Sequence, residues 1–322
     1  QDAFAQTVSA TATVAADGSF STHLAASEGD TLTVTYTSGG TETSAEDSVP
    51  DAQPLISSTV TLYDVSIDED LGVAIIVGTD DVDGYVFMLD LATLTVTDSL
   101  VISDASGLSR VAVDPANDEL IAIDTTNAVA YLLQTSDLTL EETVAVLSPG
   151  DVTMGPSGGY ALIPHIESTV AVSFFDMTTD APIGTGDATG DDGETHSSSL
   201  YVDIVNNGTN EISAMISQLS DDEYHLIVHT IDTTEGTLTQ TNAVELTGIV
   251  PAGIVLLADG QTVYITDQSG DQVVKVDLTD ESQSTIEVGD APSGITVNEV
   301  DQLAYVVNTN DRTVSIIDLT DD

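Results

Sequence analysis

The sequence predicts an all-β protein whose main body is a six-bladed β-propeller. The first observation is a repeat with an offset of 41 residues near the C-terminus. Pro251–Ile254 returns as Pro292–Ile295, and Val274–Leu278 returns as Ser315–Leu319. A period of about 40 residues made of short alternating strands is typical of a β-propeller, in which each repeat forms one blade.

The second observation is a set of six apolar segments that each read as the third strand of a blade. They recur at intervals of 41 to 56 residues, and five of the six end in Asp or Asp-Leu; they are 86–91, 129–134, 170–176, 226–232, 274–278 and 315–319. The longest interval contains the Gly- and Asp-rich stretch Gly184–His196, which we interpret as a loop insertion. Six blades follow, although the spacing leaves a count of seven open.

A propeller must close its ring, because an unpaired edge strand invites aggregation. The sixth third strand is followed only by Thr320–Asp322, so no fourth strand follows it. Residues 55–62 have strand character and precede the first inner strand, which we place at Val65–Asp68. We expect this N-terminal segment to pair with the last blade and close the ring, in a propeller unit that spans residues 51–322.

Residues 1–50 do not follow the 40-residue repeat. They read as three alternating strands over 7–14, 18–24 and 31–36, and a linker-like stretch follows at Val49–Pro54. The segment resembles the second half of a bacterial immunoglobulin-like surface domain. A complete domain of that kind needs about seven strands in about 100 residues. Half of one must pack on the propeller or receive strands from a neighbouring chain, and the second arrangement would make a head-to-tail polymer.

Charge is the other large signal, since 55 acidic residues face only Arg110, Lys275 and Arg312, for a net charge of −52. Nucleic acid and anionic membrane surfaces are excluded as partners, because both need cations. No apolar run is long enough to span a bilayer, and there is no cysteine. The Debye length is about 8 Å in 0.15 M salt and about 30 Å in 0.01 M salt, so repulsion is screened only in saline water. We expect a protein of salty or calcium-containing surroundings, outside the cell; the alternative is that acidity only keeps the surface soluble.

The C-terminal repeat resembles the YVTN family of β-propeller repeats. The run for which that family is named stands here as Tyr305–Asn308 and, more diverged, as Tyr264–Asp267. The resemblance implies a propeller, often with seven blades, in a secreted or surface protein, including components of surface layers. We interpret the recurring Asp and Asn at strand ends as side chains that bind the backbone N–H groups of turns.

Catalytic motifs are weak in this sequence. Gly155–Gly159 matches the G-x-S-x-G pattern, but it joins two predicted strands instead of a strand and a helix, so we interpret it as a turn. Gly184–Gly190 has the wrong spacing for a dinucleotide loop. His225 and His229 lie about 13 Å apart along one predicted strand, too far to share a zinc ion.

Calcium is the cofactor with the best support, because two predicted loops concentrate carboxylates. The candidate ligands are Asp80, Asp81, Asp83, Asp187, Asp191, Asp192 and Glu194. Calcium takes six to eight oxygen ligands, which such loops offer, although neither loop matches the EF-hand pattern. Asn207 begins an N-glycosylation motif in a predicted hairpin.

The sequence therefore favours a non-enzymatic extracellular protein that serves in surface structure or adhesion. Its expected partners are other copies of itself, other surface proteins or glycans. An alternative is a secreted propeller enzyme, such as a lactonase or a lyase, with a calcium-assisted carboxylate site at the central channel. A third alternative is a soluble ligand-binding module that does not assemble.

Overall fold

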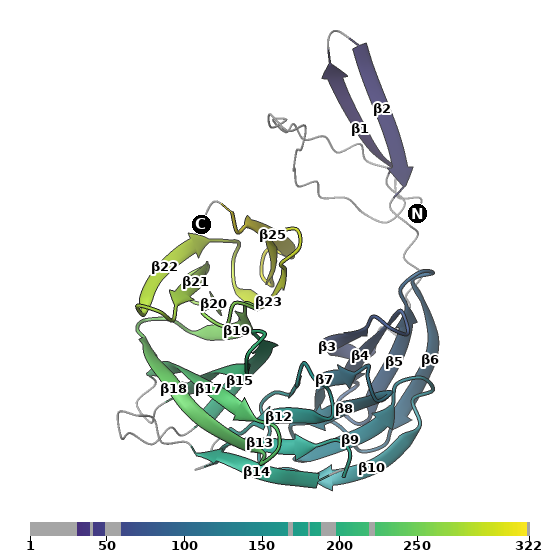
Figure 1. Cartoon of the computed structure of the whole chain (residues 1–322). Helices are drawn as coiled ribbons and strands as arrows, with labels where there is room; N and C mark the ends of the chain where they lie inside the picture. The colour runs from purple at the N-terminus through teal and green to yellow at the C-terminus, as the bar shows by residue number, and fades with distance from the viewer. Residues whose placement is uncertain are drawn as a thin grey trace. The chain divides into compact units, whose positions relative to one another are not determined.

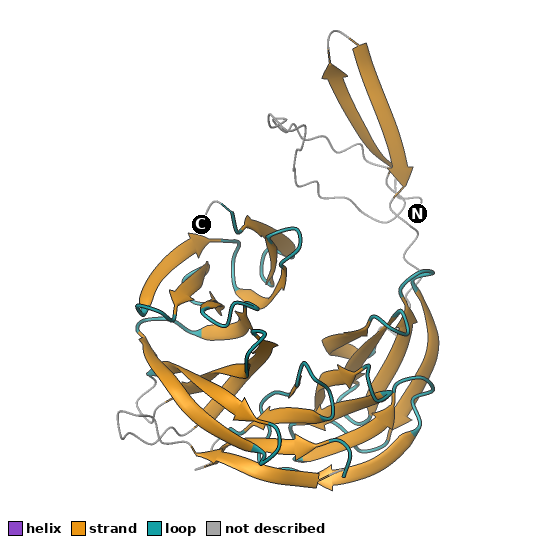
Figure 2. Ribbon diagram, viewed as in Figure 1, coloured by secondary structure: helices purple, strands orange, loops and turns teal. Residues whose placement is uncertain are grey.

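A computed structural model describes residues 31–38, 41–48, 59–166, 170–179, 181–187, 198–218 and 223–320. The chain divides into two compact units, Gln1–Ser58 and Thr59–Asp322. In the first unit, β1 (Thr31–Ser38) and β2 (Thr41–Ser48) form a two-stranded antiparallel sheet. Figure 2 shows that the described residues of both units form strands and loops, without helices. It follows that no described helix is available to cross a membrane.

The second unit is a β-propeller of six antiparallel sheets, which we number as blades 1 to 6 in chain order (Figure 1). Blade 1 contains β3 (Thr61–Asp68), β4 (Val73–Thr79), β5 (Gly84–Asp90) and β6 (Thr95–Ile102). Blade 2 contains β7 (Leu108–Asp114), β8 (Glu119–Asp124), β9 (Val129–Gln134) and β10 (Leu140–Ala145). Blade 3 contains β11 (Thr153–Met154), β12 (Tyr160–Pro164), β13 (Val170–Asp176) and β14 (Ala181–Asp187).

The remaining blades repeat this plan with one exception. Blade 4 contains β15 (Ser198–Asn206), β16 (Glu211–Gln218), β17 (Tyr224–Asp232) and β18 (Thr237–Leu246). Blade 5 contains β19 (Pro251–Leu256), β20 (Thr262–Asp267), β21 (Gln272–Asp277) and β22 (Ser282–Glu287). Blade 6 has only three described strands, β23 (Pro292–Asn298), β24 (Leu303–Asn308) and β25 (Thr313–Asp318).

Each strand pairs with the next strand of its blade, so every blade is a simple meander of hairpins. The first strand of each blade lies towards the centre of the propeller and the last lies at the outside (Figure 1). The middle strands are apolar on both faces, as in β8, because blades 2 to 5 each lie between two others. Five apolar clusters fill the five junctions between successive blades. Packing between blades is thus the main source of the buried apolar surface.

The predicted third strands are confirmed, since β9 and β13 have the predicted bounds and the other four differ by a few residues. Two expectations are wrong in part. Thr61 and Leu62 do not belong to a closing strand: they begin β3 and pair with Thr79 and Gly78, because the hairpin ladder continues to the end of β4. The predicted insertion also begins too early, since Gly184–Asp187 is the end of β14. Residues 54–58 and 188–196 lie outside the described residues.

Candidate functional site

The recurring aspartates stabilise the turns between strands. At the end of β20, Asp267 accepts hydrogen bonds from the backbone N–H of Val250 (2.9 Å) and from Ser269 Oγ and Gln272 Nε2 (both 2.8 Å). Asp124 of blade 2 accepts the backbone N–H groups of Thr126 and Asn127 in the same way. The same use of the strand-end carboxylate recurs at Asp90, Asp176, Asp232, Asp277 and Asp318. The predicted structural role of these residues is confirmed.

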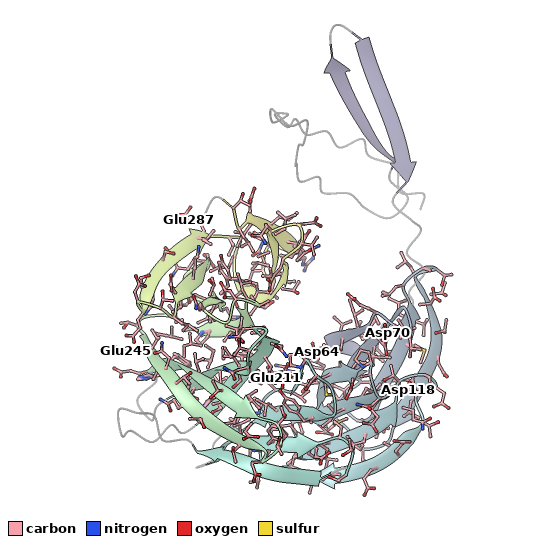
Figure 3. All side chains as sticks on the ribbon, viewed as in Figure 1. Asp64, Asp70, Asp118, Glu211, Glu245 and Glu287 are labelled. Carbon is pink, nitrogen blue, oxygen red and sulfur yellow. The ribbon has the colours of Figure 1, made fainter. Side chains whose placement is uncertain are left out.

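A second group of polar side chains lies on the innermost strands. Arg110 of β7 forms an ion pair with Asp151, with 3.3 Å between Nε and Oδ1. The charge of Arg110 also acts on Asp64 of β3, which Figure 3 labels near the centre of the propeller. Three successive blades therefore place two carboxylates and one guanidinium around the central axis.

These carboxylates also bind the backbone of the next blade. Asp64 accepts the N–H of Val111 at 3.0 Å, from blade 1 to blade 2. Asp203 of β15 accepts the N–H of Leu256 at 2.8 Å, from blade 4 to blade 5. Each of these two aspartates uses its other oxygen to bind the N–H of the residue that follows it. The central aspartates thus join neighbouring inner strands that no ladder connects.

Burial raises the pKa of these groups. The pKa of Asp151 rises to about 7, since loss of hydration outweighs the attraction of Arg110. The pKa of Asp203 rises to about 6 for the same reason, and the pKa of Asp64 is also raised. A carboxylic acid with a pKa near neutrality can exchange a proton at physiological pH. No sequence motif marks Asp64, Asp151 or Asp203 as a site, although their neighbour Arg110 is one of only three basic residues.

A further polar contact joins blades 3 and 4. Tyr160 of β12 donates a hydrogen bond to Oε2 of Glu211 (2.5 Å), and the backbone N–H of Ser157 donates to Oε1 (3.0 Å). Both side chains are buried, and Figure 3 labels Glu211 in the interior of the propeller. Both oxygens of the Glu211 carboxylate accept hydrogen bonds from the neighbouring blade, whereas Asp64 and Asp203 use only one oxygen in this way.

The predicted calcium ligands of the β4–β5 hairpin take part in local hydrogen bonds. Asp80 accepts the N–H of Asp83 (2.9 Å) and the hydroxyl of Tyr85 (2.8 Å), which together hold its pKa below the usual range. Asp83 accepts the N–H of Asp104 at 2.9 Å. Asp81 lies in the same turn with a φ of 73°. Among the described residues, no three acidic or histidine side chains gather around one point.

The second predicted calcium loop lies mostly outside the described residues. Asp187 ends β14, while Asp191, Asp192 and Glu194 fall in the range that the structure does not describe. Calcium binding at either loop stays a prediction. Asn207 lies in the β15–β16 hairpin as expected, and its side-chain oxygen accepts the N–H groups of Thr209 and Asn210.

Two other motifs have structural roles. The segment Gly155–Gly159 is the turn between β11 and β12, as the sequence predicts. His229 is buried in β17 beside Ser213, and burial lowers its pKa to about 4, so it is neutral at physiological pH. Neither motif forms a catalytic arrangement with the residues around it.

The face of blade 1 that points away from blade 2 is apolar and uncovered. Asp64 and Ser66 bind blade 2, so Val65 and Ile67 point to the opposite side, where they are 55% and 53% exposed. Their counterparts in blade 2 are Val111 and Val113, which are buried against blade 1. Blade 1 therefore leaves exposed the face that, in blades 2 to 6, packs against the preceding blade.

Blade 6 exposes the complementary face. Ala304 and Val306 pack on blade 5, so Val307 and the paired Val314 point away from it and are 47% and 44% exposed. Ile316 lies on the same side and is 48% exposed. In blade 5 the residues 41 positions earlier include Val273, which is fully buried against blade 6. Blade 1 and blade 6 thus each carry one half of a blade-to-blade contact, and both halves are exposed.

Comparison with known proteins supports the fold alone. No family model matches the sequence, and no curated protein matches it. In contrast, 1049 chains of solved structures are similar in fold. One of them is the Kuenenia stuttgartiensis hydrazine synthase structure, with a TM-score of 0.50 and 13% identity over 80% of this chain and 95% of that chain. At this identity the likeness carries no function.

Proposed function

We propose that this is a non-enzymatic extracellular protein of surface structure or adhesion, which assembles with copies of itself or with other surface proteins or glycans. The observation that carries the proposal is the pair of uncovered apolar faces, Val65 and Ile67 on blade 1 and Val307, Val314 and Ile316 on blade 6. Exposed apolar patches of this kind mark interaction surfaces in soluble proteins. The resemblance of Tyr305–Asn308 to YVTN repeats of surface proteins supports the same function.

The distribution of polar groups supports a structural role. The central carboxylates and Glu211 are held by N–H groups, by Arg110 or by Tyr160, which are the partners that keep neighbouring blades together. The strand-end aspartates hold the turns. These carboxylates therefore serve the scaffold.

The net charge of −52 sets the conditions for assembly. Two copies repel each other until salt shortens the range of the repulsion to about the Debye length. The apolar faces can then meet, and salt does not weaken an apolar contact. Assembly should therefore strengthen with ionic strength, which is the reverse of an interface made of ion pairs.

Multi-angle light scattering across protein concentration tests the proposal. The wild-type chain in 1 M NaCl should gain mass as its concentration rises, and it should approach the monomer mass in 10 mM NaCl. Negative-stain microscopy of the high-salt sample should show chains or sheets of particles. A monomer mass at every concentration and salt level, with and without calcium, would contradict the proposal.

An enzyme is the second candidate, and the central carboxylates favour it. Asp151, with a pKa of about 7, lies beside Arg110, and Asp203, with a pKa of about 6, lies on the inner strand β15, so both carboxyl groups can exchange a proton near neutral pH. A lactonase or lyase of this design would turn over lactones or acidic glycans, with calcium present. Loss of turnover in Asp151→Asn, with unchanged folding, would establish it.

A further inference from the structure

The last strand of the propeller offers an open edge. In blades 1 to 5 a fourth strand pairs with the third, whereas no described strand pairs with the outer edge of β25. The hydrogen bond from the N–H of Leu319 to the carbonyl of Gln302 shows which N–H groups of β25 point towards β24 and which point outward. Because bonded and non-bonded pairs alternate in an antiparallel ladder, the N–H groups of Val314 and Ile316 point outward.

The equivalent groups in blade 5 show what this edge is built to bind. Val273 and Lys275, 41 positions before Val314 and Ile316, pair with Ile286 and Ser284 of the fourth strand β22. The third strand of blade 6 is also the most exposed of its kind among those whose burial is described, with a single buried residue, Ile317. Within the described part of the chain, blade 6 lacks the outer strand that blades 1 to 5 have.

The N-terminal unit contains a strand with the sequence of an outer strand. The residues Thr31–Thr35 at the start of β1 read Thr-Leu-Thr-Val-Thr, identical to Thr93–Thr97, which lead into the fourth strand of blade 1. Thr237–Thr241, at the start of the fourth strand of blade 4, differ from them only by Gln for Val. All eight residues of β1 are uncharged, in a chain with 55 acidic residues.

We propose that β1 of a second copy of this chain pairs with the outer edge of β25 and serves as the fourth strand of blade 6. The inference rests on the proposed function and adds a strand contact that assembly through the apolar faces also requires. β1 lies in a compact unit separate from the propeller, and no described strand pairs with its other edge. Each copy then has one donor strand and one acceptor edge, and such a heterologous contact propagates from head to tail.

Two full-length variants remove one side of the contact each. Ile316→Pro deletes the central outward N–H of β25, a position that no bond within blade 6 uses. The double substitution Thr33→Pro and Val34→Pro interrupts β1 at both of its edges, since successive N–H groups point to opposite sides. Val300→Asp, at a turn residue that is 92% exposed, is the control for a changed surface. The melting temperature of each variant checks that the propeller is intact.

Mixing the variants gives a sharp result. In 1 M NaCl the wild type and Val300→Asp should form species longer than dimers, while each proline variant alone should remain monomeric. An equal mixture of the two proline variants should form dimers and nothing longer, because one copy has only a donor and the other only an acceptor. Monomers in the mixture, or wild-type assembly in Ile316→Pro, would overturn the strand pairing.

A labelled peptide of residues 30–39 tests the edge directly, at a protein concentration below self-association. It should bind the wild type, and Ile316→Pro should weaken its apparent Kd at least about tenfold relative to Val300→Asp. Binding to the β1 double variant but not to the wild type would show that the chain fills its own edge, which overturns pairing between copies. A monomeric wild type overturns the proposed function as well, whereas assembly that ignores Ile316→Pro overturns only the donated strand.

Discussion

Tyr160 of blade 3 donates a hydrogen bond of 2.5 Å to Glu211 of blade 4, and neither side chain is open to water. The contact joins two blades that share no backbone ladder. Burial and the bond to Glu211 both raise the pKa of Tyr160, so its hydroxyl keeps the proton that it donates. Polar contacts of this kind take the place of the salt bridges that a chain with three basic residues lacks.

Tyr160→Phe should therefore destabilise the propeller by about 2 kcal/mol, because the buried carboxylate of Glu211 loses its strongest donor. Denaturant unfolding measures the change, and the double variant with Glu211→Gln should cost less than the sum of the two single variants. Additive effects of the two substitutions would show that this hydrogen bond does not couple the blades.

The turn aspartates should contribute unequally, according to the bonds that they accept. Asp267→Ala removes the acceptor of four hydrogen bonds at the end of β20 and should cost about 3 kcal/mol. Asp70, an exposed aspartate of the β3–β4 turn, is the matched control, and Asp70→Ala should change the free energy of unfolding by less than about 0.5 kcal/mol. Equal losses in both variants would mean that net charge, not turn bonding, decides their effect.

Stability should be greatest at mildly acidic pH. Asp151 and Asp203 have folded pKa values of about 7 and about 6, above the ordinary value of 3.8, so the folded state takes up protons as the pH falls through this range and gains stability. Asp277 and Asp318 have lowered pKa values because turn groups bind their charged forms. Their contribution is present at higher pH and is lost only as the pH falls below about 4.

Melting temperatures between pH 3 and pH 8 measure this balance. The wild type should melt higher at pH 5 than at pH 8, and Asp151→Asn should reduce that difference. Acidification also lowers the net negative charge, so the comparison with Asp151→Asn separates the buried group from the general repulsion. A difference between pH 5 and pH 8 that is the same in both proteins would rule out Asp151 as its source.

Salt should stabilise each single molecule as well. With a net charge of −52, the folded chain repels itself at low ionic strength and loses that penalty when ions screen it. The melting temperature should rise between 10 mM and 1 M NaCl at a dilution where the protein is monomeric. An unchanged melting temperature would contradict the expectation that this protein functions in saline surroundings.

The repeat of 41 residues and the Asp-terminated strands were enough to predict the six blades and most third strands. The start of β3 was misplaced because Thr61 and Leu62 carry a strand pattern that continues in both directions, and only their pairing with Thr79 and Gly78 shows to which strand they belong. The central group of Asp64, Arg110 and Asp151 was missed for another reason. Its members come from three blades, and no sequence spacing shows that their side chains converge on one axis.

The uncovered faces could not be found from the sequence either. Val65 and Ile316 are apolar residues within strands, so their sequence context resembles that of buried residues. Only the order of the blades shows that no described neighbour covers them. The open edge of β25 could not be found from the sequence either, because β25 reads like the other third strands and differs only in having no described strand beside it.

The central claim, that the two end faces of the propeller are assembly surfaces, is tested most directly by light scattering of the double variant Val65→Asp and Ile316→Asp in 1 M NaCl. Both positions are about half exposed, so the substitutions leave the folded propeller intact, and Val300→Asp serves as the control. The account predicts that the double variant has the monomer mass at concentrations where wild type and control form larger species. A mass equal to that of the wild type at every concentration would contradict it.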